Sequence, residues 1–545
     1  MIIGRGWTGI STANEVADLG FQVLLIEDSE LIDKQDLDFW IPSCGMDRAT
    51  LLDEYAKLET EKQIEYLPRT DLKSCQGGVG NFVVELENEK GSLQRTVGAI
   101  VLAKELKAKP LFAEFGLEKS PNAVSLFDLE KKLESDALNR KQEWSGNRVV
   151  FLSGFHQEEN ILAQRRIMEC VSELSKRGAQ PYIYTRDLKL ADKDLEKLYK
   201  ESIEQGAIYF KTEQEPSIFA NGEWIGHTDP VLQREVQLQA DFLVVEEALT
   251  PSSNSLKLLD VFNINPGRDG LLQENNIHRL PVCTNRRGIF VAGSLRRVMT
   301  LEEVNTDAAN VALNLHNCFE KIKEQYSSSR ASIDKDKCCF CLTCYRCCPH
   351  GAIRLEDKPV ISSLDCQGCG ICASECPQEA ISLIDVQVEE IKDSISKMFK
   401  QSEQEYTPKI IACCCQNSAY EAGMAAYKFD LDLPPGLEIV RVPCAGSINL
   451  DLVLSSLHKG ADGVLIMGCH QDACKSVNGN TFAYHRNGRL QSILEEVGFS
   501  KDRVCFHTLA ENMEIEFAQY AREMEGDLKE LGPNPLLQTV SNALI

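Results

Sequence analysis

The sequence predicts an α/β protein with three units: a two-lobed Rossmann-like domain, a cysteine-rich α+β domain and a C-terminal parallel α/β domain. Two observations carry this prediction. Short apolar runs alternate with helical patterns on both sides of a cysteine-rich stretch, which is typical of parallel sheets. The 545 residues also include 22 cysteines, most of which lie between Cys338 and Cys415. Cysteines clustered in a large chain indicate metal ligation rather than a disulfide scaffold.

The apolar runs and the cysteines set the expected boundaries. Residues 1–326 form the two-lobed domain, with 147–285 as its second lobe, and its expected strands are Val23–Ile26, Ala99–Leu102, Val149–Leu152, Phe242–Val245 and Ile289–Ala292. The cysteine-rich domain covers 332–385, and a helical linker covers 386–406. The last domain covers 408–535, with strands expected at Lys409–Ala412, Leu437–Val442, Gly463–Met467 and Arg503–Phe506.

The composition argues against several classes of function. The formal net charge is −24, and such a surface repels phosphate backbones, so we expect no nucleic-acid partner. No run approaches the roughly 18 apolar residues that span a bilayer, so we expect no direct membrane insertion. The first residues lack the pattern of a signal peptide, which predicts a cytoplasmic protein.

A glycine fingerprint opens the chain. Gly4, Gly6 and Gly9 form G-x-G-x-x-G ahead of a helical pattern, and the next strand ends in Glu27. The glycines allow a tight turn and close approach of the backbone to a pyrophosphate, the helix N-terminus attracts its charge, and Glu27 can accept from ribose hydroxyls. The pattern predicts a dinucleotide site; the alternative is a turn that only packs.

The second lobe lacks such a fingerprint. After the strand Val149–Leu152 the turn reads Gly154-Phe155-His156-Gln157-Glu158-Glu159, with one glycine and two acids where a phosphate would bind. We therefore expect a Rossmann-like lobe without NAD(P).

Eight cysteines form two copies of C-x2-C-x2-C-x3-C, each followed by proline and offset by 28 residues. This is the spacing of bacterial two-cluster ferredoxins, in which the fourth cysteine of each copy ligates the other cluster. The expected [4Fe–4S] ligand sets are therefore Cys338, Cys341, Cys344 and Cys376 for one cluster, and Cys366, Cys369, Cys372 and Cys348 for the other. Two zinc sites are the alternative, although zinc sites rarely repeat with this spacing.

The C-terminal domain carries a second group of cysteines. Cys413, Cys414 and Cys415 are expected to follow its first strand, Cys444 the second and Cys469 the third, with Cys474 close behind. Loops at the carboxyl ends of parallel strands share one edge of a sheet, so these thiols can converge. We expect a [2Fe–2S] cluster on Cys444, Cys469, Cys474 and one of Cys414 or Cys415, with His470 as a hydrogen-bond donor. The alternative is a set of buried, unligated thiols.

These parts resemble known families. Residues 1 to about 385 resemble the A subunit of heterodisulfide reductase, an FAD and iron–sulfur protein, through the glycine loop, the repeat and stretches such as Gly98–Ala103, Tyr184–Asp187, Ala240–Val245 and Gly288–Gly293. Residues 408–535 resemble the delta subunit of methyl-viologen-reducing hydrogenase through Val442–Gly446, Gly460–Val464, Gly468–His470 with Cys474, and Gly479-Asn480. Such a fusion is similar to the B subunit of the quinone-interacting membrane-bound oxidoreductase complex.

The resemblance implies FAD on Gly4, Gly6, Gly9, Glu27 and Gly293, and no catalytic acid, base or nucleophile. It implies electron transfer from FAD through the clusters, inside a heterodisulfide reductase-like or quinone-interacting complex that can associate with a membrane through partner subunits. The family's Thr-Gly after one strand is Lys104-Glu105 here, and a glycine after another is replaced within Glu246–Ala248. The alternatives are a flavin-deficient iron–sulfur scaffold, and an electron-bifurcating component linked to a hydrogenase or formate dehydrogenase.

Overall fold

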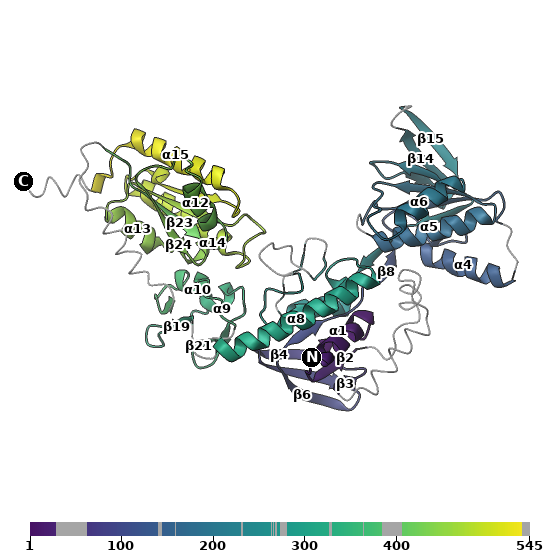
Figure 1. The fold of residues 1–545 in the computed structure, drawn as a ribbon, viewed down its shortest axis with the longest axis horizontal. Helices are drawn as coiled ribbons and strands as arrows, with labels where there is room; N and C mark the ends of the chain where they lie inside the picture. Colours follow the sequence, from purple (N-terminus) through teal and green to yellow (C-terminus); the bar gives the residue numbers. More distant parts are fainter. Residues whose placement is uncertain are drawn as a thin grey trace, which may run out of the picture.

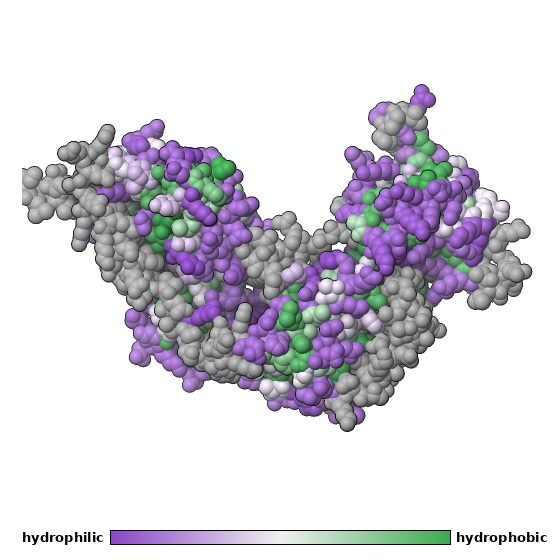
Figure 2. All heavy atoms as spheres, viewed as in Figure 1, coloured by the Kyte–Doolittle hydropathy of each residue, from purple (hydrophilic) through white to green (hydrophobic). Residues whose placement is uncertain are grey.

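The computed structural model describes residues 1–28, 63–139, 144–157, 160–229, 233–262, 264, 266–267, 270–272, 281–325, 330–362, 365–383 and 406–536. These residues form three parallel sheets, one in each N-terminal lobe and one in the C-terminal domain. The second lobe and the C-terminal domain lie at opposite ends of the molecule, and the cysteine-rich domain lies beside the C-terminal domain (Figure 1). The surface in this view is mostly hydrophilic, with small hydrophobic patches (Figure 2).

The first lobe is built on a parallel sheet whose strands are, in spatial order, β18 (Ile289–Val291), β7 (Ile100–Leu102), β1 (Ile2–Ile3), β2 (Val23–Ile26) and β3 (Ile64–Leu67). Helix α1 (Trp7–Asp18) follows the glycine loop and packs against the long helix α8 (Leu301–Gln325), which runs toward the cysteine-rich domain (Figure 1). An antiparallel sheet of β4 (Asp71–Gly78), β5 (Asn81–Asn88) and β6 (Gly91–Val97) packs beside it. Buried aliphatic side chains from both sheets form one core.

The second lobe repeats the parallel design with β12 (Ile208–Lys211), β11 (Gln180–Thr185), β10 (Arg148–Ser153), β16 (Phe242–Val245) and β9 (Ala123–Ser125). Its helices are α4 (Leu126–Asn139), α5 (Ile161–Lys176) and α6 (Leu195–Glu204), and it adds the antiparallel strands β13 (Ser217–Phe219), β14 (Trp224–Asp229) and β15 (Arg234–Gln239). The pair β8 (Lys107–Pro110) and β17 (Glu247–Thr250) joins the lobes, and α7 (Ser253–Phe262) follows it.

The cysteine-rich domain is small and has pseudo-twofold character. Two antiparallel pairs, β19 (Ala331–Ile333) with β22 (Ile381–Leu383) and β20 (Ile353–Leu355) with β21 (Pro359–Ile361), flank the short helices α9 (Thr343–Cys347) and α10 (Ile371–Ser374). Its buried cluster combines isoleucines with cysteines of both repeats. A hydrophobic core this small needs additional cross-links, such as metal centres, for its stability.

The C-terminal domain is a parallel sheet in the order β24 (Leu437–Val442), β23 (Ile410–Cys415), β25 (Gly463–Gly468) and β26 (Val504–Thr508). Two separate apolar clusters cover its two faces. The helices are α12 (Ala419–Lys428), α13 (Leu450–His458), α14 (Gly479–Glu496) and α15 (Glu514–Leu531).

The predicted fold class is confirmed by these sheets, with one difference at the cysteine triplet. Strand β23 runs through Cys413–Cys415 and does not end before them, because its ladder with β24 continues through all three residues. The predicted helical linker 386–406 lies almost wholly outside the described residues. In the part of the chain that is described, no helix is long and apolar enough to cross a membrane.

Candidate iron–sulfur and dinucleotide sites

The first three cysteines of the repeat meet the last one. Burial raises the pKa of the Cys344 thiol, and the nearby thiols of Cys341, Cys338 and Cys376 raise it further. Cys376 also accepts a hydrogen bond from the backbone N–H of Ala380, with N···S 3.3 Å. The structure therefore groups Cys376 with the first cysteine set, as the crossover assignment requires.

The second group has the same construction. Burial raises the pKa of the Cys369 thiol to about 12, and the charges of Cys348 and Cys366 add to this effect. Cys348 accepts from the backbone N–H of Ala352 with N···S 3.4 Å, which repeats the Ala380–Cys376 bond after the same offset. Such N–H donors to sulfur are among the groups that tune the potential of a bound cluster.

Four cysteines of the C-terminal domain converge where its strands end. Cys415, Cys444, Cys469 and Cys474 form a buried cluster, and none of them is more than 3% exposed. The sulfurs of Cys415 and Cys469 are 3.8 Å apart. Two sulfurs bound to one tetrahedral metal at about 2.3 Å are about 3.8 Å apart, so this spacing suits a shared metal centre.

Contacts among these four sulfurs shift their pKa values in opposite directions. Donation by the thiols of Cys444 and Cys469 lowers the pKa values of Cys415 and Cys474, and the same bonds raise the pKa values of the two donors. Thiolates are the form of cysteine that binds metal.

The strand geometry separates Cys414 from this group. Successive side chains of a strand point to opposite faces, so Cys414 packs in the apolar cluster on the other side of the sheet, with Ala412 and Phe517 among its members. Of the two candidates for the first ligand, the structure brings Cys415 to the other three cysteines and places Cys414 away from them.

His470 points away from the sulfurs. Its Nδ1 lies 3.0 Å from Thr508 Oγ1 and its Nε2 lies 3.2 Å from Met513 Sδ. The ring therefore contacts β26 and the loop that precedes α15.

The two cysteine-bearing domains meet at Cys369, which packs against the four C-terminal cysteines. Arg486 of α14 ties the same junction together: its Nε lies 2.9 Å from Glu375 Oε1, and it donates to the carbonyls of Gly446 and Ile448. A cavity of about 320 Å³ opens beside Cys369 and is lined by residues of all three domains, including Arg287 and Lys475.

The donor sets fit iron–sulfur clusters. In the described residues, no three or more His, Cys, Asp or Glu side chains form the shell of a single metal ion. The three cysteine groups are instead sulfur-only sets with N–H donors to sulfur, which is the donor chemistry of [4Fe–4S] and [2Fe–2S] clusters.

The glycine fingerprint has the expected backbone geometry. A Cβ added to Gly4 would lie 2.4 Å from the carbonyl oxygen of Ala103, and one on Gly9 would lie 1.8 Å from the carbonyl oxygen of Gly4, so both positions require glycine. Gly293 contacts the start of α1 in the same way, because its Cβ would lie 2.3 Å from Thr8 Oγ1.

The loop itself is in contact with acidic and basic side chains from another strand end. Glu105, just beyond β7, accepts from the backbone N–H of Thr8 (2.8 Å) and from Ser294 Oγ (2.6 Å). The Nζ atom of Lys104 lies 3.4 Å from Glu27 Oε1 and 2.6 Å from Asp28 Oδ2. The groups expected to hold a pyrophosphate and a ribose therefore already have partners within the chain, and this arrangement does not fit a bound dinucleotide.

A carboxylate occupies the corresponding turn of the second lobe. Glu246, at the end of β16, accepts from three consecutive backbone N–H groups, those of Phe155 (2.9 Å), His156 (3.2 Å) and Gln157 (3.0 Å). The sequence indicated the acidic replacement here and at Glu105, but it did not predict that either carboxylate binds the loop of its own lobe.

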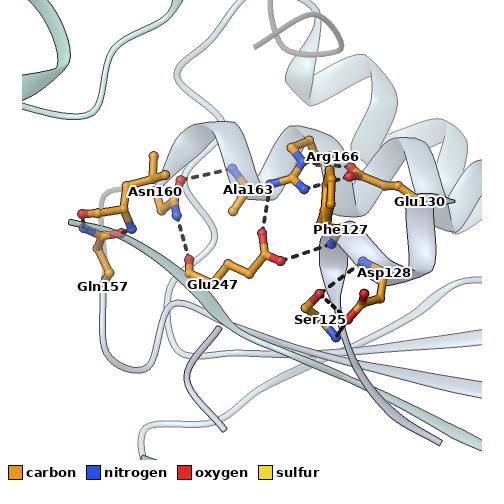
Figure 3. Close-up of polar contacts among 10 residues, drawn as sticks. Ser125, Phe127, Asp128, Glu130, Gln157, Asn160, Ala163, Arg166 and Glu247 are labelled. Atoms are coloured by element: carbon orange, nitrogen blue, oxygen red, sulfur yellow. Dashed lines mark hydrogen bonds and ion pairs between the residues drawn. The ribbon is translucent and has the colours of Figure 1, made fainter. Parts of the chain in front are cut away.

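The next residue, Glu247, contacts a buried arginine (Figure 3). Arg166 of α5 lies 3.0 Å from Glu247 Oε2 and 2.7 Å from Glu130 Oε2, and its side chain is fully buried. Glu247 also accepts from the backbone N–H of Phe127. Sequence analysis missed this triad, because its members are far apart in the chain and belong to no motif.

Comparisons with known proteins identify an iron–sulfur domain within the cysteine repeat and a hydrogenase delta-subunit domain after it. A family model described as methyl-viologen-reducing hydrogenase, delta subunit, matches residues 410–532, and a 4Fe-4S binding domain model matches residues 359–382. The iron-sulfur D subunit of an F420-non-reducing hydrogenase from Archaeoglobus profundus is 32% identical over 24% of this chain and 95% of its own length.

The larger match is to the A subunit of a ferredoxin:CoB-CoM heterodisulfide reductase from Methanosarcina mazei, 23% identical over 84% of this chain. The chain spans about 60% of the length of that relative. Thioredoxin reductase from T. acidophilum is a structural neighbour with a TM-score of 0.41 and 15% identity, covering 59% of this chain and 97% of that one. The chain thus combines a region like the A subunit of heterodisulfide reductase with a domain like the hydrogenase delta subunit.

Proposed function

The C-terminal domain of this chain belongs to the family of methyl-viologen-reducing hydrogenase delta subunits, and from that premise we propose that the chain is an iron–sulfur electron-transfer subunit of a multisubunit oxidoreductase. The complex is of the heterodisulfide reductase-like or quinone-interacting type. Two [4Fe–4S] clusters in residues 332–385 and a [2Fe–2S] cluster on Cys415, Cys444, Cys469 and Cys474 form the electron path.

The contact of Cys369 with the four C-terminal cysteines carries this proposal. A ligand of the second [4Fe–4S] cluster there lies directly against the ligands of the next centre. Bound clusters would supply one-electron carriers, and their potentials depend on burial and on hydrogen bonds to sulfur. The chain supplies both: it buries the C-terminal thiols and directs backbone N–H groups at Cys348 and Cys376.

The sequence predicted that FAD also belongs to this electron path. The first lobe instead favours a second candidate, which has no FAD. Glu105 and Lys104 bind the residues that the sequence assigns to FAD. The candidate is a flavin-deficient iron–sulfur subunit in which the two-lobed domain serves assembly and docking.

Electron paramagnetic resonance of the reduced, anaerobically purified full chain tests the path. We expect magnetic coupling between the C-terminal cluster and the nearer [4Fe–4S] cluster to broaden their signals. Cys348→Ser should remove about four irons and abolish the coupling, because the fourth ligand crosses over. Cys376→Ser is the matched variant: it should also remove about four irons, from the farther cluster, and leave the coupling intact.

Two results would count against the proposal. Sharp, uncoupled signals in the unaltered chain would argue against a continuous path through Cys369. Loss of coupling in Cys376→Ser, with coupling retained in Cys348→Ser, would reverse the crossover assignment.

A further inference from the structure

Both N-terminal lobes share one feature at the carboxyl ends of their strands. Parallel α/β domains bind the phosphates of dinucleotides at this edge, through backbone N–H groups of the first loop and of the following helix N-terminus. In each lobe a glutamate from a neighbouring strand end already accepts from such donors: Glu105 from one backbone N–H group and Glu246 from three. Glu105 stands where the resembling family carries glycine, and Glu246 belongs to the segment Glu246–Ala248 in which another family glycine is replaced.

In the first lobe, Glu105 fills the space that the glycine fingerprint leaves open. A Cβ built on Gly6 would lie 2.3 Å from Glu105 Cγ and 2.7 Å from Glu105 Oε1. The stem of the side chain as well as its carboxylate therefore packs where a pyrophosphate would approach the loop. Thr8 and Ser294 hold the two carboxylate oxygens from opposite sides, and both of these residues are buried.

Lys104 closes the other half of the same site. Its ammonium lies between Glu27 and Asp28, and its side chain is only 10% exposed. Glu27 in turn accepts from the backbone N–H groups of Arg5 and Asp28. The carboxylate expected to meet the ribose hydroxyls thus already has a cation and two N–H donors around it.

In the second lobe, Glu246 reproduces the bonding of a bound phosphate. Its side chain is 4% exposed, and three successive N–H groups of the turn after β10 point at its two oxygens. Successive N–H groups of this kind form an anion-binding concavity. A buried carboxylate with three donors is satisfied, so nothing draws it out of the turn.

We propose that Glu105 and Glu246 take the places of the two dinucleotide pyrophosphates, so that neither lobe binds FAD, NADH or NADPH through its phosphate loop. The lobes keep the loop geometry of dinucleotide-binding domains and use it to hold their own strand ends together. Like-charge repulsion between a carboxylate and a pyrophosphate beside it should lower the affinity at least about a hundredfold.

The test uses the anaerobically purified full chain. Flavin released by heat, and equilibrium dialysis against FAD and against NADH, should show no bound dinucleotide in the unaltered protein. The double variant Lys104→Thr, Glu105→Gly restores the residues that the resembling family carries, and it should bind FAD at least about a hundredfold more tightly. Glu114→Gly removes an exposed carboxylate outside the loop and is the matched control, which should bind no FAD.

FAD that copurifies with the unaltered chain, or NADH that binds it in dialysis, would overturn the proposal. A folded double variant without a gain in FAD binding would overturn the assignment of Glu105, and Glu105→Ala replaces it if the double variant does not fold. Iron content is measured on the same samples. Because it reports on the clusters alone, failure of this proposal is distinguishable from failure of the electron-path proposal.

Discussion

The C-terminal domain and the second lobe are both parallel sheets covered by helices, and in both the loops after the strands meet at one edge. In the C-terminal domain that edge brings together four cysteine sulfurs from Cys415, Cys444, Cys469 and Cys474. In the second lobe it brings together the carboxylate of Glu246 and three backbone N–H groups. One edge presents metal-binding atoms, and the other has its binding groups satisfied within the chain.

This difference shows what a sequence motif does and does not specify. A cysteine motif names the atoms that bind, since thiolates are the ligands of iron–sulfur clusters. A glycine fingerprint specifies only a backbone turn without side chains and a row of N–H donors, and it does not specify what binds there. The side chain that fills the space comes from another strand, as Glu105 does beside Gly6.

Replacing Cys415 is expected to have the largest effect. Cys415→Ala should remove the C-terminal cluster and about two irons per chain, because one of four ligands is lost. Cys414→Ala changes the neighbouring residue on the opposite face of β23, and it should leave the iron content unchanged. Iron and sulfide analysis with visible absorbance measures both variants. Equal iron loss in the two variants would contradict the prediction that only the cysteine on one face of β23 is a ligand.

Replacing Arg166 should have the next largest effect, and it should be confined to the second lobe. Arg166→Met leaves Glu247 and Glu130 buried without their cation, a change that costs about 3–5 kcal/mol. Lys200→Met, which breaks an exposed pair with Glu196 in the same lobe, should have a much smaller effect on stability. Hydrogen exchange of β10 and β11 measures the local stability, since unfolding of a multidomain chain is not a two-state process. Similar exchange rates in both variants would show that the triad does not stabilise the lobe.

A smaller effect is expected from pH, at His227. Burial lowers the pKa of this histidine, an effect that Asp229 opposes, and its Nδ1 lies 3.0 Å from the hydroxyl of Tyr184. The unfolded chain therefore binds a proton more readily than the folded lobe, and stability should fall as pH decreases below about 6.5. His227→Gln should flatten the dependence of β11 exchange on pH between about 7 and 5, whereas exposed His485→Gln should not. An unchanged slope in His227→Gln would assign the pH dependence to other groups.

Several parts of the fold follow from local pattern. Each strand expected from an apolar run lies in one of the three parallel sheets, within a few residues of its expected bounds, because apolar runs bounded by turn signals are a local property. The spacing of the cysteine repeat likewise predicts which cysteines share a cluster. The strands β3, β9, β11 and β12 of the same parallel sheets were not predicted. The sequence did not predict which of Cys414 and Cys415 joins the other three cysteines, because the answer depends on how far β23 continues.

The contacts that oppose dinucleotide binding could not be derived from the sequence. Glu105 and Gly6 are far apart in the chain, and so are Glu246 and Phe155. Only the fold determines which strand end lies beside which loop. The replaced residues themselves were visible, so an acid at the end of a neighbouring strand is a signal to look for beside any glycine fingerprint.

The Arg486 bridge bears on how this chain can be divided. The free-standing hydrogenase relatives align over nearly their whole length with the last domain alone, which suggests an independent module. Here, however, Arg486 pairs with Glu375 across the domain boundary while holding the carbonyls of Gly446 and Ile448, just beyond Cys444. Cutting the chain before 408 would leave this largely buried guanidinium without its carboxylate, next to a ligand loop. Arg486 therefore couples the two domains, and we expect an excised C-terminal piece to be less stable than the same domain in the full chain.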